Sequence, residues 1–393
     1  MINLHIVRNS FTYDSRVLKE TESIQNANLF KQVKICAFQN NKDDAEYDDF
    51  QGRKVWRVPL RTKTLPKNLP SQLIKYCEWH WRIIKTYGHQ PIAVIHCHDL
   101  APLPIALHLK LLTGARLIYD AHELETEMAG SYGIRKWMAR IVERLMIRGV
   151  DAMITVSPSI QQWYQNKYPL PSCSLVRNIP KRIASHTQPK NLRDILGIKG
   201  DVLLFIYLGG LSKGRGIENM LSAFQNPRVC HHLLIMGSGF LYSEVQLAVN
   251  ACSRIHYLNP VPPSQVLEYT MGANVGISLV EDIALSYRYC LPNKLFEYIV
   301  SGLPVLVSDL IDQKSLVEQY QAGWVTDNTL QSIVDFLSWI SQEKYEQLKS
   351  GLHERTQNLD WGYETQELLK IYQNQLSDIE DSHHQIKDYG GRF

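Results

Sequence analysis

The fold of this chain is decided by residues 291–306, which read LPNKLFEYIVSGLPVL. The proline at position 292 predicts the start of a helix, because its missing N–H costs nothing at the first helical position. Helix N-termini carry partial positive charge and unpaired N–H groups, which suit a phosphate. Lys294 falls in the first turn, and Glu297 one turn deeper could accept both hydroxyls of a ribose. Because an apolar strand follows Gly302 at once, the stretch predicts a nucleotide-binding α/β domain.

Short apolar segments alternate with helical patterns along nearly the whole chain. This alternation is typical of βαβ units and of mostly parallel sheets. In the first half we expect strands at 2–7, 32–38, 92–97, 115–119, 151–156 and 173–176. In the second half we expect strands at 203–208, 232–236, 254–258, 274–279, 304–307 and 323–326. A polar, proline-bearing segment at 177–190 predicts a linker, so the sequence indicates two Rossmann-like domains in series.

The composition is that of a globular protein of 393 residues, with 45% hydrophobic and 21% charged side chains. Residues 1–180 hold 24 Lys and Arg against 16 Asp and Glu, whereas the rest of the chain is mildly acidic. Different partners for the two halves are therefore expected. The seven cysteines are scattered and form no CxxC pair. Together with the lack of a long apolar segment, they predict a protein of the cytoplasm.

Two loops that contain glycine follow strands of the second half. Gly209 and Gly210 begin a loop that carries Lys213 and Arg215, and these two cations can neutralise a diphosphate. Gly237 lies in the second loop, after the strand at 232–236. In isolation, an ordinary turn between strand and helix explains each loop equally well.

Histidines follow two of the strands expected in the first half. His96 and His98 lie on one face of the strand that ends near position 97, because side chains alternate along a strand. His122 follows the next strand. A pair of histidines two residues apart can bind a metal, but the sequence identifies no third ligand, so we expect no metal site.

Residues 291–306 resemble the donor-sugar segment of group 1 (family 4) glycosyltransferases, which have the two-domain GT-B fold. The resemblance implies two Rossmann-like domains that face each other across a cleft. The N-terminal, acceptor-side domain would span 1–180 and receive a crossing helix at 361–376. The nucleotide-sugar-binding domain would span 190–358, and a polar tail 377–393 would follow.

The resemblance also implies roles for single residues. Donor binding would involve Gly209, Gly210, Gly237, the backbone at Val261, Asn293, Lys294 and Glu297. The residues that act on the reacting groups would be His98, His122, Lys213 and Arg215. Two positions depart from the family pattern. Gly210 stands where relatives commonly carry an arginine, and Tyr289 stands where many relatives place a second glutamate.

The function that the resemblance implies is transfer of a sugar from a nucleoside diphosphate sugar to an acceptor hydroxyl, with retention of configuration. Such enzymes need no catalytic metal and no cofactor, and the acceptors are cell-surface glycans or lipid-linked glycoconjugates. Two alternatives stay open. One is a nucleotide-sugar epimerase or hydrolase of the same fold, and the other is a non-catalytic binding subunit, which Tyr289 and Gly210 motivate.

The first half also contains a basic amphipathic pattern at 135–148, with cations at positions 136, 140, 144 and 148. Residues 51–88 add nine cations with Glu78 as the only acid. For 135–148, a helix packed on the sheet with a solvated basic stripe is the preferred explanation. An anionic membrane surface, on the inner face of the membrane, and a lipid-linked acceptor are kept as candidate partners. No nucleic-acid-binding motif accompanies the charge, so we expect no nucleic acid partner.

Overall fold

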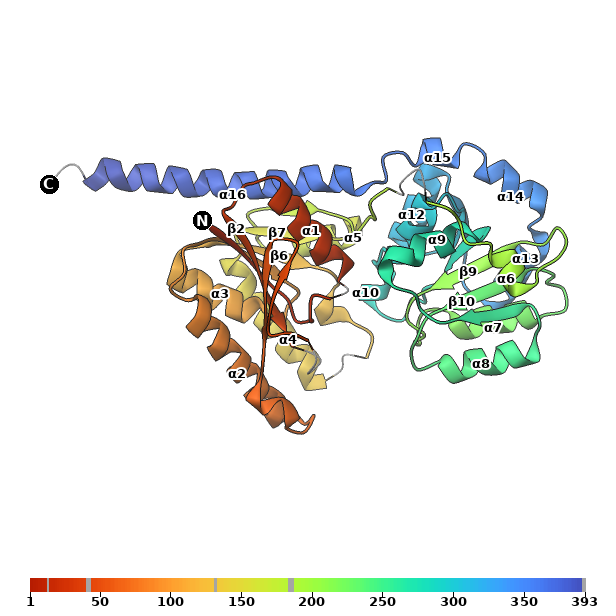
Figure 1. Cartoon of the computed structure of the whole chain (residues 1–393), viewed down its shortest axis with the longest axis horizontal. Helices are drawn as coiled ribbons and strands as arrows, with labels where there is room; N and C mark the ends of the chain where they lie inside the picture. Colours follow the sequence, from red (N-terminus) through yellow and green to blue (C-terminus); the bar gives the residue numbers. More distant parts are fainter. Residues whose placement is uncertain (13, 40–43, 131–132, 183–186, 391–393) are drawn as a thin grey trace. The chain divides into compact units, whose positions relative to one another are not determined.

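The computed structural model describes residues 1–12, 14–39, 44–130, 133–182 and 187–390 of the chain. These residues form two compact units (Figure 1). Unit 1 comprises Met1–Arg177 and the segment from Thr365 onward, and unit 2 comprises Asn178–Glu364. Each unit is an α/β domain built on one sheet.

Unit 1 contains an eight-stranded sheet in the order β3-β4-β2-β1-β5-β6-β7-β8. All pairs are parallel except β3 with β4, which form an antiparallel hairpin at the edge. The strands are β1 (Ile2–Ile6), β2 (Gln32–Phe38), β3 (Tyr47–Phe50), β4 (Arg53–Val58), β5 (Ile92–His98), β6 (Arg116–Ala121), β7 (Ala152–Thr155) and β8 (Cys173–Leu175).

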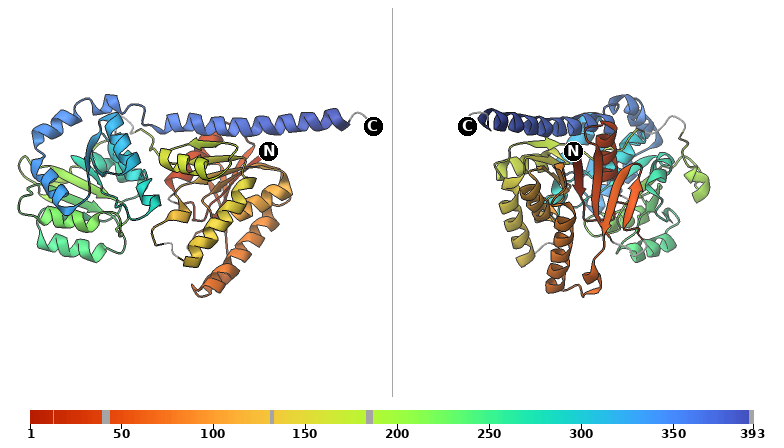
Figure 2. Two further views of the ribbon diagram at one scale, coloured as in Figure 1. Left: turned by 180° about the vertical axis from the view of Figure 1, so that it is seen from behind. Right: turned by 60° about the vertical axis from the view of Figure 1, so that its left-hand side comes forward.

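Helices cover both faces of this sheet (Figure 2). They are α1 (Ser15–Asn26), α2 (Leu69–Tyr87), α3 (Leu103–Thr113), α4 (Gly133–Met146), α5 (Pro158–Lys167) and the long α16 (Trp361–Gly390). On one face, α2 packs against β2 through the edge-on contact between Trp79 and Phe38. On the opposite face, Tyr372 of α16 bonds to His96 of β5. Arg16 of α1 bonds to Asp120 of β6 on the same face.

Unit 2 contains a fully parallel six-stranded sheet in the order β11-β10-β9-β12-β13-β14. The strands are β9 (Leu204–Leu208), β10 (His232–Met236), β11 (Ile255–Leu258), β12 (Val275–Ser278), β13 (Val305–Ser308) and β14 (Gly323–Thr326). Its helices are α6 (Leu192–Leu196), α7 (Ile217–Gln225), α8 (Tyr242–Ala251), α9 (Val266–Met271), α10 (Leu285–Arg288), α11 (Asn293–Val300), α12 (Ile311–Tyr320), α13 (Leu330–Trp339), α14 (Gln342–Lys349) and α15 (Leu352–Arg355).

Two hydrophobic cores lie on opposite faces of this second sheet, because successive residues of each strand point to opposite sides. Phe205 packs in the core under α7, α8 and α13. Its neighbours Leu204 and Ile206 pack in the other core, under α9, α11 and α12. Burial on both faces explains why these strands are continuous apolar runs rather than alternating ones.

The prediction of two Rossmann-like domains with mostly parallel sheets is confirmed. The crossing of the last helix to the first domain is also confirmed, since the chain from Thr365 onward belongs to unit 1. The helix extends to Gly390, well past the expected end at 376. The hairpin of β3 and β4 was not predicted from the sequence; its turn residues Gln51 and Gly52 both have positive φ (54° and 83°). Within the described residues, every helix is too short or too polar to cross a bilayer.

Candidate functional site

The two glycine loops of unit 2 lie side by side at the carboxyl ends of β9 and β10. The N–H of Gly209 donates to the carbonyl of Met236 at 3.1 Å, and the N–H of Leu211 donates to the carbonyl of Ser238 at 2.8 Å. A Cβ atom on Gly237 would lie 2.0 Å from the carbonyl oxygen of Gly209, so no larger residue fits there. The two glycine loops are therefore in direct backbone contact.

Lys294 places a buried ammonium against this pair of loops. Its Nζ lies 3.6 Å from the centre of the Tyr207 ring and 3.6 Å from the position of a Cβ on Gly209. Burial and the nearby charge of Arg215 lower the pKa of Lys294 to about 7, although Glu297 acts in the opposite direction. A cation held over an aromatic face and only partly protonated at neutral pH is well placed to gain from an arriving anion.

The helix that carries Lys294 begins one residue later than expected. Pro292 is the N-cap residue of α11 (φ −64°, ψ 142°), and Asn293 is the first helical residue. Asn293 is exposed, and Glu297 is half-buried one turn further on. Val261 is half-buried against the core under α9 and α11. Lys294, Asn293 and Glu297 thus come from the first two turns of one helix, as the sequence predicted.

The two cations in the loop after Gly209, Arg215 and Lys213, have different surroundings. The guanidinium of Arg215 lies 4.9 Å from the centre of the Tyr287 ring. Lys213 is exposed, and Gly210 leaves open space where a Cβ would be. The backbone of this loop is tied to Glu281, whose Oε1 accepts a hydrogen bond from the N–H of Gly216 at 3.2 Å.

Unit 2 also has an open groove of about 620 Å³ along α12. Its lining includes Asp282, Arg288, Asp309 and Lys314, and these residues form two ion pairs, Arg288 with Asp282 and Lys314 with Asp309. No residue expected to bind the donor lines this groove, so the groove adds nothing to the donor site.

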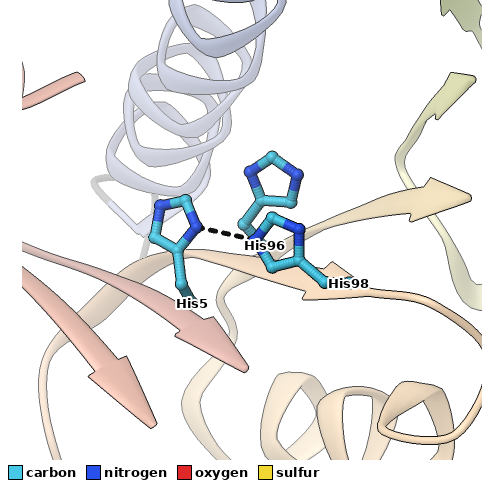
Figure 3. Close-up of side chains that lie close together, drawn as sticks. All are labelled: His5, His96 and His98. Atoms are coloured by element: carbon cyan, nitrogen blue, oxygen red, sulfur yellow. Dashed lines mark hydrogen bonds between the residues drawn. The ribbon is translucent and has the colours of Figure 1, made fainter. Parts of the chain in front are cut away.

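In unit 1, the register of the sheet brings histidines of different strands together. His5 of β1 pairs with His96 of β5, and His98 of β5 pairs with Asp120 of β6. Figure 3 shows the rings of His5, His96 and His98 close together on these two neighbouring strands. The Nδ1 of His5 lies 2.9 Å from the Nε2 of His98.

His122 joins the same group from the end of β6. Its Nε2 lies 3.2 Å from the Nδ1 of His98 and 2.9 Å from the Oδ2 of Asp120. Burial alone would lower the pKa of His122, but the carboxylates of Asp99 and Asp120 outweigh it and raise the pKa to about 10. The imidazole is therefore an imidazolium at neutral pH. One-fifth of the His122 side chain is exposed, whereas His98 is 2% exposed.

The structure thus brings His98 and His122 together, but it gives them different surroundings. Only His122 has an exposed edge that a ligand can touch. His98 is buried behind it, and its Nε2 bonds to His5.

Beneath the histidines lies a buried guanidinium. Arg16 of α1 donates from Nε and Nη2 to the two oxygens of Asp120, each at 2.8 Å, and from Nη1 to the carbonyl of Val176 at 2.8 Å. Its Nε also lies 3.1 Å from the Oε1 of Glu20. Burial would raise the pKa of the Asp120 carboxyl, but Arg16 and His122 together hold that pKa well below its usual range.

The pKa of the Glu20 carboxyl is raised, whereas that of Asp120 is lowered. Burial raises the pKa of its carboxyl to about 8, although Arg16 opposes this shift. Donor atoms of Glu20, His96, His98 and Asp120 all lie within 4.8 Å of one another, which is the grouping of a metal site. From the sequence, only His96 and His98 could be named as candidate metal ligands. The further ligand-type groups come from α1 and β6, which are distant in the chain.

Several residues of both groups were not predicted from the sequence. In unit 2, neither Tyr207, a strand residue, nor Glu281, a loop residue, belongs to a recognisable sequence motif. In unit 1, Tyr372 reaches the histidines from a helix 276 positions along the chain from His96. Only His5 had a usable signal, since a polar residue inside a buried first strand is unusual.

Comparison with known proteins gives two matching family models. Residues 26–175 match a glycosyl transferase 4-like domain, and residues 224–371 match the C-terminal domain of glucosyltransferase 3-like proteins. Among individual relatives, glucosyltransferase 3 of Streptococcus parasanguinis is 24% identical over 132 residues. That match spans 33% of this chain and 38% of the relative's own length.

Solved structures share the fold over nearly the whole chain. Sucrose-phosphate synthase from Thermosynechococcus elongatus superposes with a TM-score of 0.77 at 15% identity, covering 96% of this chain and 100% of the other. HepE from Anabaena, solved in complex with UDP-glucose, superposes with a TM-score of 0.71 at 12% identity, covering 95% of this chain and 100% of the other. The two domain models match in order along one chain of GT-B architecture, and the chain belongs to the group 1 glycosyltransferases.

Proposed function

We propose that the chain transfers a sugar from a nucleoside diphosphate sugar to an acceptor hydroxyl, with retention of configuration, in the synthesis of a cell-surface glycan or glycoconjugate. The observation that carries the proposal is the buried ammonium of Lys294, held beside Gly209 at the N-terminus of α11. The family of the chain supports the reaction type. The UDP-glucose in the structure of HepE makes UDP-glucose the first donor to test.

In this proposal the cations of unit 2 stabilise the leaving diphosphate. Lys294 and Arg215 bind its oxygens together with the N–H groups of α11, and the exposed Lys213 adds charge. Fixed cations take the place of a divalent ion at the diphosphate, so the transfer needs no metal there and no cofactor. Glu297 binds the ribose hydroxyls, and the backbone around Val261 contacts the base.

In unit 1, His122 orients the donor sugar. Its Nε2–H is bonded to Asp120, so the Nδ1–H, which lies 3.5 Å from the Oδ2 of Asp99, is the donor that remains for the sugar. The leaving phosphate oxygen takes the proton of the acceptor hydroxyl, and the protein therefore needs no general base.

Product analysis separates this function from its alternatives. We expect the chain, incubated with radiolabelled UDP-glucose and a lipid or glycan extract, to form a labelled glycoside at a rate that added Mg²⁺ or Mn²⁺ leaves unchanged. Free labelled glucose as the sole product would indicate a hydrolase, and a labelled epimer of the nucleotide sugar would indicate an epimerase. Donor binding without any product, across UDP-, GDP-, ADP- and dTDP-sugars, would indicate a binding subunit.

We also propose that unit 1 contacts an anionic membrane surface through helices α2, α3 and α4, with the protein on the cytoplasmic side. Helix α3 contacts both α2 and α4. Of the 22 exposed large apolar side chains in the described part of the chain, ten lie on these three helices: Leu69, Leu73, Ile74, Trp81, Leu111, Leu112, Ile134, Trp137, Met138 and Leu145. Such a concentration on one layer of a domain is typical of an interaction surface.

The charge of α4 supports the same surface in part. Two of its cations, Lys136 and Arg140, pair with Glu127 at 3.0 and 2.7 Å and are neutralised within the domain. Arg135 and Arg144 of α4, and Arg148 in the turn that follows it, are exposed. An acceptor that is linked to lipid would lie at such a membrane surface, which fits the proposed transfer.

The first prediction concerns the proton of Lys294. Because its pKa is about 7, a bound diphosphate should draw up to about one proton onto Lys294 at pH 8, and UDP affinity should fall as pH rises above 7. Calorimetry in buffers of different ionisation enthalpy measures this uptake. Lys294→Met should abolish it and weaken UDP binding by about 1.5–3 kcal/mol, the size of a lost charge-assisted hydrogen bond.

Lys314→Met is the matched control, because Lys314 is an exposed lysine that pairs with Asp309. It should leave both affinity and proton uptake unchanged. A binding heat for the wild type that is independent of the buffer would rule out Lys294 as the diphosphate ligand.

The second prediction concerns Glu297. Glu297→Gln should weaken UDP binding by about 1.5–3 kcal/mol, because a carboxylate that accepts from two hydroxyls is lost. The same loss should disappear when the ligand is 2′,3′-dideoxy-UDP, which has no hydroxyls for Glu297 to bind. Glu318→Gln on α12 serves as the control. An equal loss with both ligands would show that Glu297 acts on something other than the ribose.

The third prediction concerns the membrane surface. The protein should float with anionic vesicles at low salt and less so as salt rises, because surface charges are screened over about 10 Å at 0.1 M. Replacing Arg135, Arg144 and Arg148 by Gln should remove most of this flotation. Replacing Trp137 and Leu145 by Ser should remove it at every salt concentration.

The control for flotation is a variant of unit 2 with the same loss of charge. It carries Arg228→Gln, Arg288→Gln and Lys314→Gln, all at exposed positions. It should float as the wild type does. Wild-type protein that stays at the bottom of the gradient would refute the membrane surface.

A further inference from the structure

The group of buried ligand-type side chains in unit 1 contains atoms whose hydrogen-bonding capacity is unused. Among the described residues, neither the Oε2 of Glu20 nor the Nε2 of His96 has a hydrogen-bond partner, and both atoms are inaccessible to solvent. Glu20 and His96 are each 0% exposed. Because a buried polar atom without a partner is costly, such a pair indicates a bound group.

The spacing of these atoms fits a metal ion. The Nε2 of His96 lies 3.9 Å from the Oε2 of Glu20 and 3.7 Å from the Oδ2 of Asp120. The Nδ1 of His98 lies 3.9 Å from the same Glu20 oxygen and 3.3 Å from the same Asp120 oxygen. Each of the four atoms therefore lies within 3.3–3.9 Å of two of the others. One ligand atom from each of the four residues lies within 4.8 Å of the others. A small inward shift of these side chains would bring them to the ~2.0–2.2 Å at which nitrogen and oxygen bind zinc.

A water molecule does not fit the same centre. Hydrogen bonds from water to oxygen or nitrogen span about 2.7–3.2 Å, so four acceptors or donors around one water would lie further apart than these do. Direct hydrogen bonds do not explain the spacing either, because three of the four contacts are 3.7 Å or longer. A small cation that draws the four atoms inward by a few tenths of an ångström explains it.

Three of the four side chains have their other polar atom hydrogen-bonded to a neighbour, and the Oε1 of Glu20 forms an ion pair with Arg16 without a hydrogen bond. The Nδ1 of His96 bonds to the hydroxyl of Tyr372 at 2.7 Å. The second oxygens of Asp120 and Glu20 lie 2.8 and 3.1 Å from nitrogens of Arg16. Partners of this kind orient the residues that bind a metal and fix which atom faces it.

The tautomer of His98 is fixed by hydrogen bonds that run through His5 to Asn3. The Oδ1 of Asn3 can only accept, so the Nε2 of His5, 2.8 Å away, carries a hydrogen. A neutral His5 then accepts at Nδ1 from the Nε2–H of His98. The lone pair of His98 is consequently on Nδ1, the atom that faces Glu20 and Asp120. The same atom lies 3.2 Å from the Nε2 of His122, so an ion must also displace this contact.

The donor set also indicates which ion would bind. Two neutral imidazoles and two carboxylates this close together suit zinc, whereas magnesium and calcium prefer six or more oxygen ligands. The Oδ2 of Asp120 also accepts from the Nε of Arg16 and the Nε2 of His122, so an ion must compete for this oxygen. That competition disfavours ions that bind mainly through carboxylates.

We propose that Glu20, His96, His98 and Asp120 bind one zinc ion, which joins α1 to strands β5 and β6. The ion lies in the interior of unit 1 and has no part in binding the diphosphate. Through the bond of His96 to Tyr372 it also anchors α16 on the sheet.

The metal content of the purified protein tests the site. Because the site is closed to solvent, the ion must enter during folding, so the protein is expressed in medium supplemented with zinc or with cobalt. Elemental analysis should find about one zinc per chain, and the cobalt form should show the strong visible absorption of tetrahedral cobalt(II). X-ray absorption at the zinc edge should show only nitrogen and oxygen ligands, at about 2.0–2.1 Å.

Variants locate the ion. Glu20→Gln and His96→Gln should each reduce the bound zinc at least tenfold. His80→Gln should retain it, because His80 belongs to a separate exposed pair with His108. Wild-type protein that contains neither metal after both cultures would overturn the proposal. Sulfur in the X-ray absorption spectrum would also overturn it, and this measurement on the wild type decides the matter even if the variants do not fold.

Discussion

Both candidate sites depend on one constraint of parallel sheets: the carboxyl ends of neighbouring strands lie at the same edge, and a crevice opens where the strand order reverses. In unit 2 the reversal falls between β9 and β12, and β9 ends in Tyr207, Leu208 and then Gly209. In unit 1 it falls between β1 and β5, the strands that carry His5, His96 and His98. The chemically versatile residues of each domain are thus gathered by topology from segments far apart in the sequence.

The two units use buried cations in opposite ways. Arg16 is fully engaged, since its guanidinium contacts two carboxylates and a backbone carbonyl, and it serves to hold α1 on the sheet. Lys294 lies over the ring of Tyr207, with its pKa lowered to about 7 by burial and by Arg215. A cation whose charge is unfavourable in the empty protein gains the most when an anion arrives. This difference is why Lys294, and not Arg16, is the residue on which the proposed donor site rests.

Much of the fold was predictable from the sequence, because apolar runs buried on both faces, such as those of β9 and β10, are unmistakable in an α/β protein. The hairpin of β3 and β4 was missed because its residues at 47–50 are mostly polar and exposed. Among the site residues, Lys294 and Glu297 were found because they share one short helix. Glu20, Asp120 and Tyr372 could not be found, since only strand register and helix packing bring them to His96. The basic stripe at 135–148 was only partly informative, because the sequence does not show that Glu127 neutralises Lys136 and Arg140.

A crystal structure of the protein grown with UDP tests the central claim most directly. The account predicts diphosphate oxygens within hydrogen-bonding distance of the Nζ of Lys294 and against the backbone of Gly209, with the ribose hydroxyls on Glu297. Density for the diphosphate anywhere else, with Lys294 still over the ring of Tyr207 and in contact with no anion, would contradict it.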